Sequence, residues 1–220
     1  MFIVEALIII NILFEDVNGL ELGSVTDWLS AGSSIITLIF AAYVYSNWQK
    51  EKYRDDAYEI QKKIVTQYYP KIFNTLEELE FKLENYNSRI LSYNHSLKDS
   101  VLMDMQTYLL DTITELEVST QQLTNDLDIM RLFRYEPIDQ FQKITLGFTK
   151  TIALLIQIIR TIITSLLGLK MSEFDRVRQS MYRSFTGNIP EAKKILLRLT
   201  EAKTYIFSNN TDLRKLFVNF

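Results

Sequence analysis

A run of 22 residues without a charged side chain, from Trp28 to Gln49, constrains the fold of this chain more than any other stretch. A helix of that length extends about 30 Å, which matches the hydrocarbon core of a bilayer. Trp28 and Trp48 lie near its two ends, where an amphipathic indole ring suits the membrane interface. We therefore predict a transmembrane helix over residues 25–49. Its predicted anchoring residues are Trp28, Trp48, Lys50, Lys52 and Arg54.

The charges around this helix give it a direction. Residues 1–49 carry five acidic side chains and no lysine or arginine, whereas residues 170–220 carry 10 basic and 5 acidic side chains. Basic residues near a membrane span remain on the cytoplasmic side. The sequence therefore predicts an N-terminus outside the membrane and the bulk of the chain in the cytoplasm.

Residues 1–24 form an apolar N-terminal arm in this prediction. The run from Phe2 to Phe14 is apolar, but as a helix it reaches only about 20 Å, which is too short to span. It also lacks the basic start and the small-residue cleavage site of a signal peptide. We expect the arm to pack in the outer leaflet or against the main helix. The alternative is a tilted second strut that places the N-terminus inside, but no positive charge holds Met1 there.

Four small residues of the predicted span share one helix face, because their spacings are four, three and four. Small residues let helix backbones approach closely in lipid, where packing drives association. This face predicts self-association into a homo-oligomer, and the alternative is that the span merely tolerates small residues. The four residues are Ser30, Ser34, Thr37 and Ala41.

Two heptad patterns follow the span and predict an antiparallel helical hairpin, which we assign to a cytoplasmic domain over residues 50–143. A polar break, NHSLKDS, separates them, and acidic side chains such as Glu77 and Asp126 fall off the apolar positions, as on solvated helix faces. The first pattern is Ile72, Leu76, Leu79, Leu83, Tyr86, Ile90, Tyr93 and Leu97. The second pattern is Leu109, Ile113, Leu116, Thr120, Leu123, Leu127 and Met130.

A second apolar region, residues 144–170, contains the run from Thr151 to Leu169. A polar stripe runs along it at helical spacing. Arg160 lies near its midpoint, where a charge costs about 2.5–3.5 kcal/mol on insertion into a bilayer. Crossing would also export the basic C-terminal region. The favoured interpretation is the central helix of a bundle; an interfacial helix and a true second span remain open. The stripe, an intramembrane one in the last case, comprises Lys150, Gln157, Arg160, Thr161 and Thr164.

Residues 171–220 are predicted to form two or three short basic helices. The segment GNIP, residues 187–190, is expected to break the chain, with Pro190 in a first helical turn. One face of the following helix is apolar and predicts a core-facing side. The region lacks a dense arginine cluster interleaved with aromatic residues, so an ordinary surface is favoured over a nucleic-acid or lipid site. The core-facing residues are Ile195, Leu196, Leu199, Ala202 and Ile206.

Catalytic chemistry has no support in this sequence. There is no cysteine and one histidine, His95, which excludes thiol catalysis and a multi-histidine metal site. Phosphate-binding loops, zinc-protease motifs and dinucleotide fingerprints are absent. Glu77, Glu80 and Glu84 share a helix face but lack the histidine companions of di-metal bundles. We therefore expect no enzymatic activity, no cofactor and no small-molecule substrate.

The layout supports a resemblance to a known class of protein. The opening DWLSAGSSIITLIFAAYVYSNWQKEK resembles the anchor of many small bacterial membrane proteins, where one span leads directly into a cytoplasmic helix. With the heptad hairpin and the second apolar run, the chain resembles the transmembrane effectors of bacterial anti-phage systems, in particular retron-associated ones. That resemblance implies a toxin in the inner membrane, held silent by a retron reverse transcriptase and its RNA–DNA product. It carries no catalytic residues.

Two classes of function follow. The first is an all-α membrane effector that compromises the inner membrane when triggered, with the lipid bilayer and further copies of itself as partners. The second is a passive membrane-anchored scaffold that binds a partner through the heptad hairpin. Toxicity on expression distinguishes the two classes.

Overall fold

The computed structural model describes residues 25–92, 98–133, 135–171, 175–208 and 217–219. The arm predicted over residues 1–24 lies outside them, as do Tyr93 and Leu97 of the first heptad pattern. The chain forms two compact units, residues 1–52 and residues 53–220, which are described separately below.

The first described helix, α2, covers Val25–Lys63 and continues without an α-helical break until a π-helical turn, η1, at Ile64–Tyr68. Helix α3, Tyr69–Ser92, follows directly. Pro70 explains the change of helix type, because proline lacks an N–H and its ring collides with the carbonyl of residue 66 in a regular helix. The wider π turn avoids this conflict, and the backbone N–H of Tyr69 donates to the carbonyl of Ile64.

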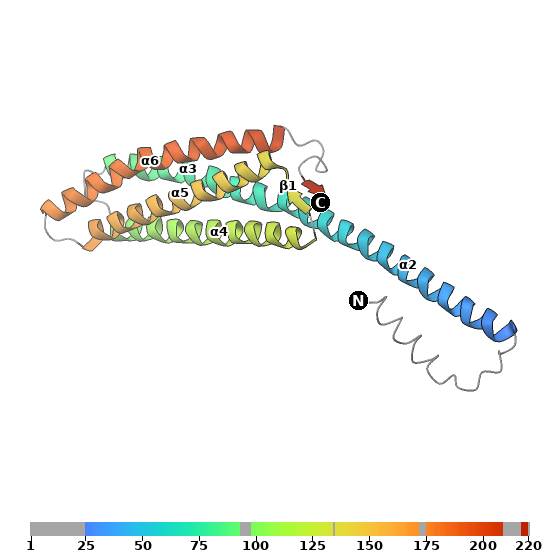
Figure 1. The fold of residues 1–220 in the computed structure, drawn as a ribbon. Helices are drawn as coiled ribbons and strands as arrows, with labels where there is room; N and C mark the ends of the chain where they lie inside the picture. Colours follow the sequence, from blue (N-terminus) through green and yellow to red (C-terminus); the bar gives the residue numbers. More distant parts are fainter. Residues whose placement is uncertain (1–24, 93–97, 134, 172–174, 209–216, 220) are drawn as a thin grey trace. The chain divides into compact units, whose positions relative to one another are not determined.

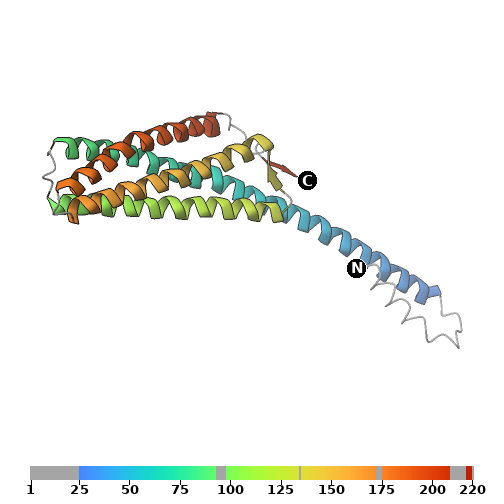
Figure 2. The same cartoon turned by 60° about the vertical axis from the view of Figure 1, so that its left-hand side comes forward.

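Four long helices of the second unit form an up-down-up-down bundle. After α3 come α4 at Asp99–Leu132, α5 at Asp139–Met171 and α6 at Asp175–Ser208. Figures 1 and 2 show α3 to α6 side by side, with each helix antiparallel to the next along the chain. Short connections between antiparallel neighbours are typical of such bundles. The antiparallel hairpin predicted from the heptads is therefore α3 with α4.

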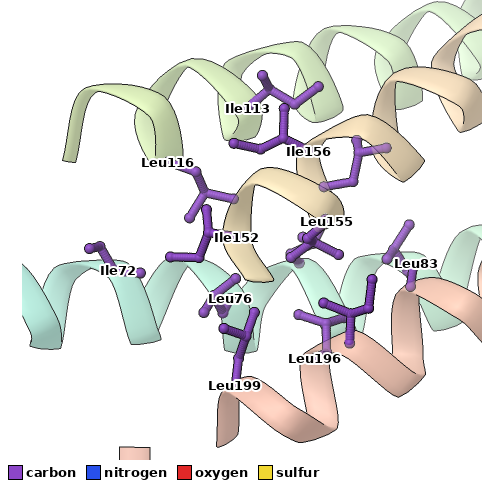
Figure 3. Packing of buried hydrophobic residues seen from close by; sticks show 14 of the residues in the cluster. Ile72, Leu76, Leu83, Ile113, Leu116, Ile152, Leu155, Ile156, Leu196 and Leu199 are labelled. Atoms are coloured by element: carbon purple, nitrogen blue, oxygen red, sulfur yellow. The ribbon is translucent and has the colours of Figure 1, made fainter. Parts of the chain in front are cut away.

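The core of the bundle is built on α5. Figure 3 shows Ile152 and Leu155 of α5 between side chains of α3, α4 and α6, with Ile156 beside Ile113 of α4. Ile152, Leu155 and Leu196 are almost completely buried. The apolar residues at heptad spacing on α3 and α4 face this core, which confirms the predicted periodicity. Those that are buried are Ile72, Leu76, Leu79, Leu83, Tyr86, Ile90, Leu109, Ile113, Leu116, Leu123 and Met130.

Two boundaries differ from the sequence-based prediction. The predicted domain limit between residues 143 and 144 lies inside α5, because the helix begins at Asp139 and already buries Phe141. The break expected at residues 187–190 is wrong, since α6 continues through Pro190. Phe185, Ile189 and Ala192 are all buried on one face of α6, and this packing offsets the roughly 3 kcal/mol cost of an internal proline.

The described part of the chain is all-α apart from one short strand pair. Strand β1, Tyr135–Pro137, pairs antiparallel with β2, Phe217–Asn219, with Glu136 opposite Val218. Among the described residues, one helical stretch, Asp139–Lys170 within α5, is long and apolar enough to cross a membrane. Half of its most apolar window is buried inside the bundle. The predicted span over residues 25–49 stays a prediction.

Candidate functional site

The apolar part of α2 within the first unit exposes its side chains. From Ser33 to Trp48 every described residue is exposed, including Ile36, Leu38 and Phe40 at 65–70 %. Each fully buried side chain of this kind would gain about 1.5–3 kcal/mol on leaving water, so an unburied row of them is unfavourable in water. This exposed apolar surface differs from α5, whose apolar side faces the bundle.

Three hydroxyl groups in that segment are hydrogen-bonded within the helix. Ser33 Oγ and Ser34 Oγ donate to the carbonyl of Ser30 at 2.8 and 2.9 Å, and Thr37 Oγ1 donates to the carbonyl of Ser33 at 2.7 Å. Backbone-bonded hydroxyls avoid the cost of an unpaired polar group in hydrocarbon. The predicted packing face, with Ser30, Ser34, Thr37 and Ala41, is exposed along α2.

The predicted anchoring residues follow along the same helix. Trp28 lies in the first turn of α2, and Trp48 is exposed near the end of the apolar segment. Lys52 Nζ lies 5.4 Å from the centre of the Trp48 ring, within the range of a cation–π contact. Lys50 and Arg54 are exposed, and Arg54 Nε lies 3.6 Å from Asp55 Oδ1. An indole beside cationic side chains is typical of a membrane interface.

The polar stripe predicted on α5 is present and faces away from the core. Lys150, Gln157, Thr161 and Thr164 are exposed. Arg160 donates through Nη2 to Glu117 Oε1 of α4 at 2.7 Å, and the two side chains are 61 % and 47 % exposed. Exposed pairs of this kind contribute only about 0–1 kcal/mol. The stripe is therefore a surface of the bundle, with Arg160 held across to α4.

An open groove of about 510 Å³ lies between α4 and α5, next to this ion pair. Its floor is apolar, with Ile152 and Ile156, and its walls carry hydroxyl and amide groups. The hydroxyl of Thr120 is buried without a hydrogen-bond partner among the described residues. The polar wall residues include Thr120, Gln121, Thr124, Asn125, Thr149 and Gln157. Sequence reasoning missed this groove, because its two walls come from different helices.

Helix α4 is bonded to the π turn by a three-residue cluster that the sequence analysis did not identify. Tyr68 Oη donates to Asp126 Oδ2 at 2.8 Å, and Lys63 Nζ lies 3.3 Å from the same oxygen. Hydrogen bonds with Tyr68 and Asp126 raise the pKa of Lys63. Asp126 was expected on a solvated face; instead its side chain is only 15 % exposed. The neighbouring Tyr69 bonds Thr145 of α5 at 2.8 Å through their buried hydroxyls.

Raising the pH above 10 is expected to destabilise the bundle. Burial raises the pKa of Tyr68, Tyr69 and Tyr86 above the usual 10, and that of Tyr108 to about 12. Because the folded-state pKa exceeds the unfolded one, this contribution is fully present below pH 10 and is lost as the pH rises through the folded values. Denaturant titrations at increasing pH measure the loss, and Tyr108→Phe should reduce it. An equal loss in both proteins contradicts the assignment to Tyr108.

Two of the three glutamates considered as cation ligands, Glu77 and Glu84, bind lysines of α6 instead. Lys193 Nζ donates to Glu84 Oε1 at 2.8 Å, and Lys203 donates to Glu77. Among residues that the structure describes, no group of three or more aspartate, glutamate, histidine or cysteine side chains could hold a metal ion. These acids therefore join α3 to α6.

Comparison with known proteins adds no relative. No protein-family model, curated protein or solved structure matches this chain.

Proposed function

We propose that this protein is a membrane-anchored helical effector that compromises the bacterial inner membrane when triggered. In this proposal α2 anchors the chain with the bulk of it in the cytoplasm, and α5 is the segment that acts on the bilayer. The bundle is then the resting form, in which the apolar side of α5 is covered by its neighbours.

The observation that supports the proposal is that α5 has the composition of a membrane span but is packed inside a helical bundle. It is long and apolar enough to cross a bilayer, yet half of its most apolar window is buried in the bundle. Release from α3, α4 and α6 would expose Ile152, Leu155 and Ile159 to a new environment. A bilayer would accept these side chains, and about 0.8 kcal/mol per buried methylene favours that transfer over exposure to water.

Arg160 provides the sharpest test of this mechanism. Its charge near the middle of α5 opposes insertion by about 2.5–3.5 kcal/mol, whereas its exposed ion pair contributes little to the bundle. Arg160→Leu should therefore favour insertion by roughly 70–400-fold and increase the loss of membrane potential on expression. A potential-sensitive dye in growing cells measures the effect.

Glu117→Gln is the matched control for this experiment. It removes the same ion pair but leaves the apolar side of α5 and the Arg160 charge unchanged. We expect little change in membrane potential relative to the wild-type protein. Equal effects of Arg160→Leu and Glu117→Gln would assign the result to loosening of the bundle. High expression of the wild-type protein without depolarisation would contradict the proposed function itself.

The defence context belongs to the same proposal. The resemblance in layout implies a retron reverse transcriptase with its RNA–DNA product as the silencing partner. Co-expression of a reverse transcriptase encoded beside this chain should suppress depolarisation and co-purify with the effector. If it does neither, the retron assignment fails while the membrane activity stays testable on its own.

A second candidate, a passive anchored scaffold, is favoured by the groove between α4 and α5. The heptad residues Leu79 and Leu116 are fully buried in the bundle, so they do not offer a binding surface in this state. A partner would instead bind outward-facing side chains along the groove. Expression of such a protein causes no depolarisation. A pull-down with the wild-type protein recovers the partner, and the Gln121→Arg substitution in the groove abolishes that binding.

A further inference from the structure

The two sides of the four-helix bundle differ in polarity. Helices α3 and α6 carry charged outer faces joined by the Lys193–Glu84 and Lys203–Glu77 pairs. Helices α4 and α5 instead carry eight of the exposed large apolar side chains described in α3 to α6, five on α4 and three on α5, against two on α3 and three on α6. Those eight are Met103, Leu110, Val118, Ile129, Leu132, Leu146, Leu154 and Leu167.

One row of exposed positions along the outer side of α4 carries no charged side chain, and exposed aspartates such as Asp104, Asp111 and Asp128 flank it. Nine exposed positions follow one another at spacings of three and four residues, and none is ionisable. The same is nearly true of α5 between Lys150 and Lys170, where Arg160 is the one charge and is paired with Glu117. Charge depletion around exposed apolar side chains is typical of protein interfaces. The nine are Met103, Thr107, Leu110, Thr114, Val118, Gln121, Asn125, Ile129 and Leu132.

We propose that this α4–α5 surface binds a second copy of the same chain, with α4 of each copy against α5 of the other. The commonest oligomers are two-fold dimers in which the same patch serves on both subunits. Helix α4 carries seven acidic residues and one basic residue, a balance of −6, whereas α5 carries four basic residues and one acidic residue, a balance of +3. Glu115, Glu117, Asp126 and Asp128 already pair within the chain, so the opposite charges that can meet between copies are those of the remaining α4 acids and the α5 lysines.

The positions of the apolar side chains fix the direction of the two-fold axis. Leu110 precedes Glu117 by seven residues and Leu167 follows Arg160 by seven, so in antiparallel helices both lie at the same height. Ile129 and Leu146 likewise lie within about 3 Å of one height. A two-fold axis parallel to the helices then sets Leu110 against Leu167 of the second copy, and Ile129 against Leu146.

The surface is large enough for a stable dimer. Two helices of 34 and 33 residues extend about 50 Å, and at a usual interhelical distance their joint face is about 18 Å wide. This gives roughly 900 Å² per copy, compared with about 800 Å² per partner in standard interfaces.

Cross-linking tests the pairing directly, because the full-length chain contains no cysteine of its own. Two differently tagged chains, one with Leu110→Cys and the other with Leu167→Cys, are co-expressed and treated with a short bis-maleimide. A heterodimer of the two tags is expected. Phe81→Cys with Leu197→Cys, two equally exposed apolar positions on α3 and α6, should give none. Equal yields from both pairs would overturn the proposal.

Light scattering tests the dimer independently, because cross-linking can also trap chains that collide by chance. Light scattering of the detergent-solubilised full chain should report a dimer, and Leu110→Glu with Leu167→Glu should weaken it by about tenfold or more, because the new carboxylates face each other. Phe81→Glu with Leu197→Glu should leave the dimer unchanged. A monomeric wild-type protein, or a dimer that survives the first pair of substitutions, overturns the proposal. The second result would assign self-association to another face, such as that of Ser30 and Ser34.

Discussion

Arginine at both Ile39 and Phe40 is expected to move the protein from the membrane fraction to the soluble fraction. Both side chains are 65 % exposed on α2, near the middle of its apolar segment. Each arginine at the centre of a span costs about 2.5–3.5 kcal/mol, so the pair opposes insertion by about 5–7 kcal/mol. Carbonate extraction of membranes followed by immunoblotting measures the distribution.

Phe81→Arg with Leu197→Arg is the control for this experiment. These side chains are equally exposed, at 63 % and 62 %, but they lie on α3 and α6 of the bundle. The control should stay in the membrane fraction. Retention of the Ile39 and Phe40 variant would show that another segment holds the chain in the bilayer, and the proposed role of α2 would be wrong.

Replacement of Leu196 by alanine is expected to lower the free energy of unfolding of the bundle by about 2–5 kcal/mol. Leu196 is 2 % exposed and lies on the core side of α6 (Figure 3). Truncation there removes buried methyl groups and leaves a cavity between α6, α5 and α3. Denaturant unfolding followed by far-ultraviolet circular dichroism measures the loss.

The adjacent residue supplies a matched control. Leu197→Ala makes the same chemical change one position along α6, but Leu197 is 62 % exposed. Its effect should stay within about 0.5 kcal/mol. Similar losses at the two positions would contradict the packing of α6 against the core.

Most of the core-facing residues of the helices can be predicted from local periodicity. The apolar residues of α3, α4 and the second half of α6 were identified from spacings of three and four, since residues at such spacings share one helix face. Of the five predicted on α6, Ile195, Leu196, Leu199 and Ile206 are buried, and Ala202 is partly buried against the core. Helix α5 packs in the bundle with its polar stripe facing outward, as the favoured interpretation predicts, and its entry into a bilayer stays a prediction.

Helix continuity could not be read in the same way. Pro70 and Pro190 carry the same local signal, yet the chain enters a π turn before one and continues as an α-helix through the other. Apolar side chains are buried on both sides of each proline, so burial keeps both segments helical, and local propensity is too weak to oppose that packing.

Some features of the candidate site follow from the sequence, and the others follow only from the tertiary structure. The sequence by itself determined which stretches are apolar and which helix faces are polar. It also showed that Arg160 interrupts the apolar run from Thr151 to Leu169. Only the tertiary structure decided that Arg160 meets Glu117 and that Asp126 binds Tyr68 and Lys63. The physical reason is distance along the chain. Periodicity is set by residues three or four apart, whereas these contacts join residues 43 to 63 positions apart, whose meeting depends on how the helices pack.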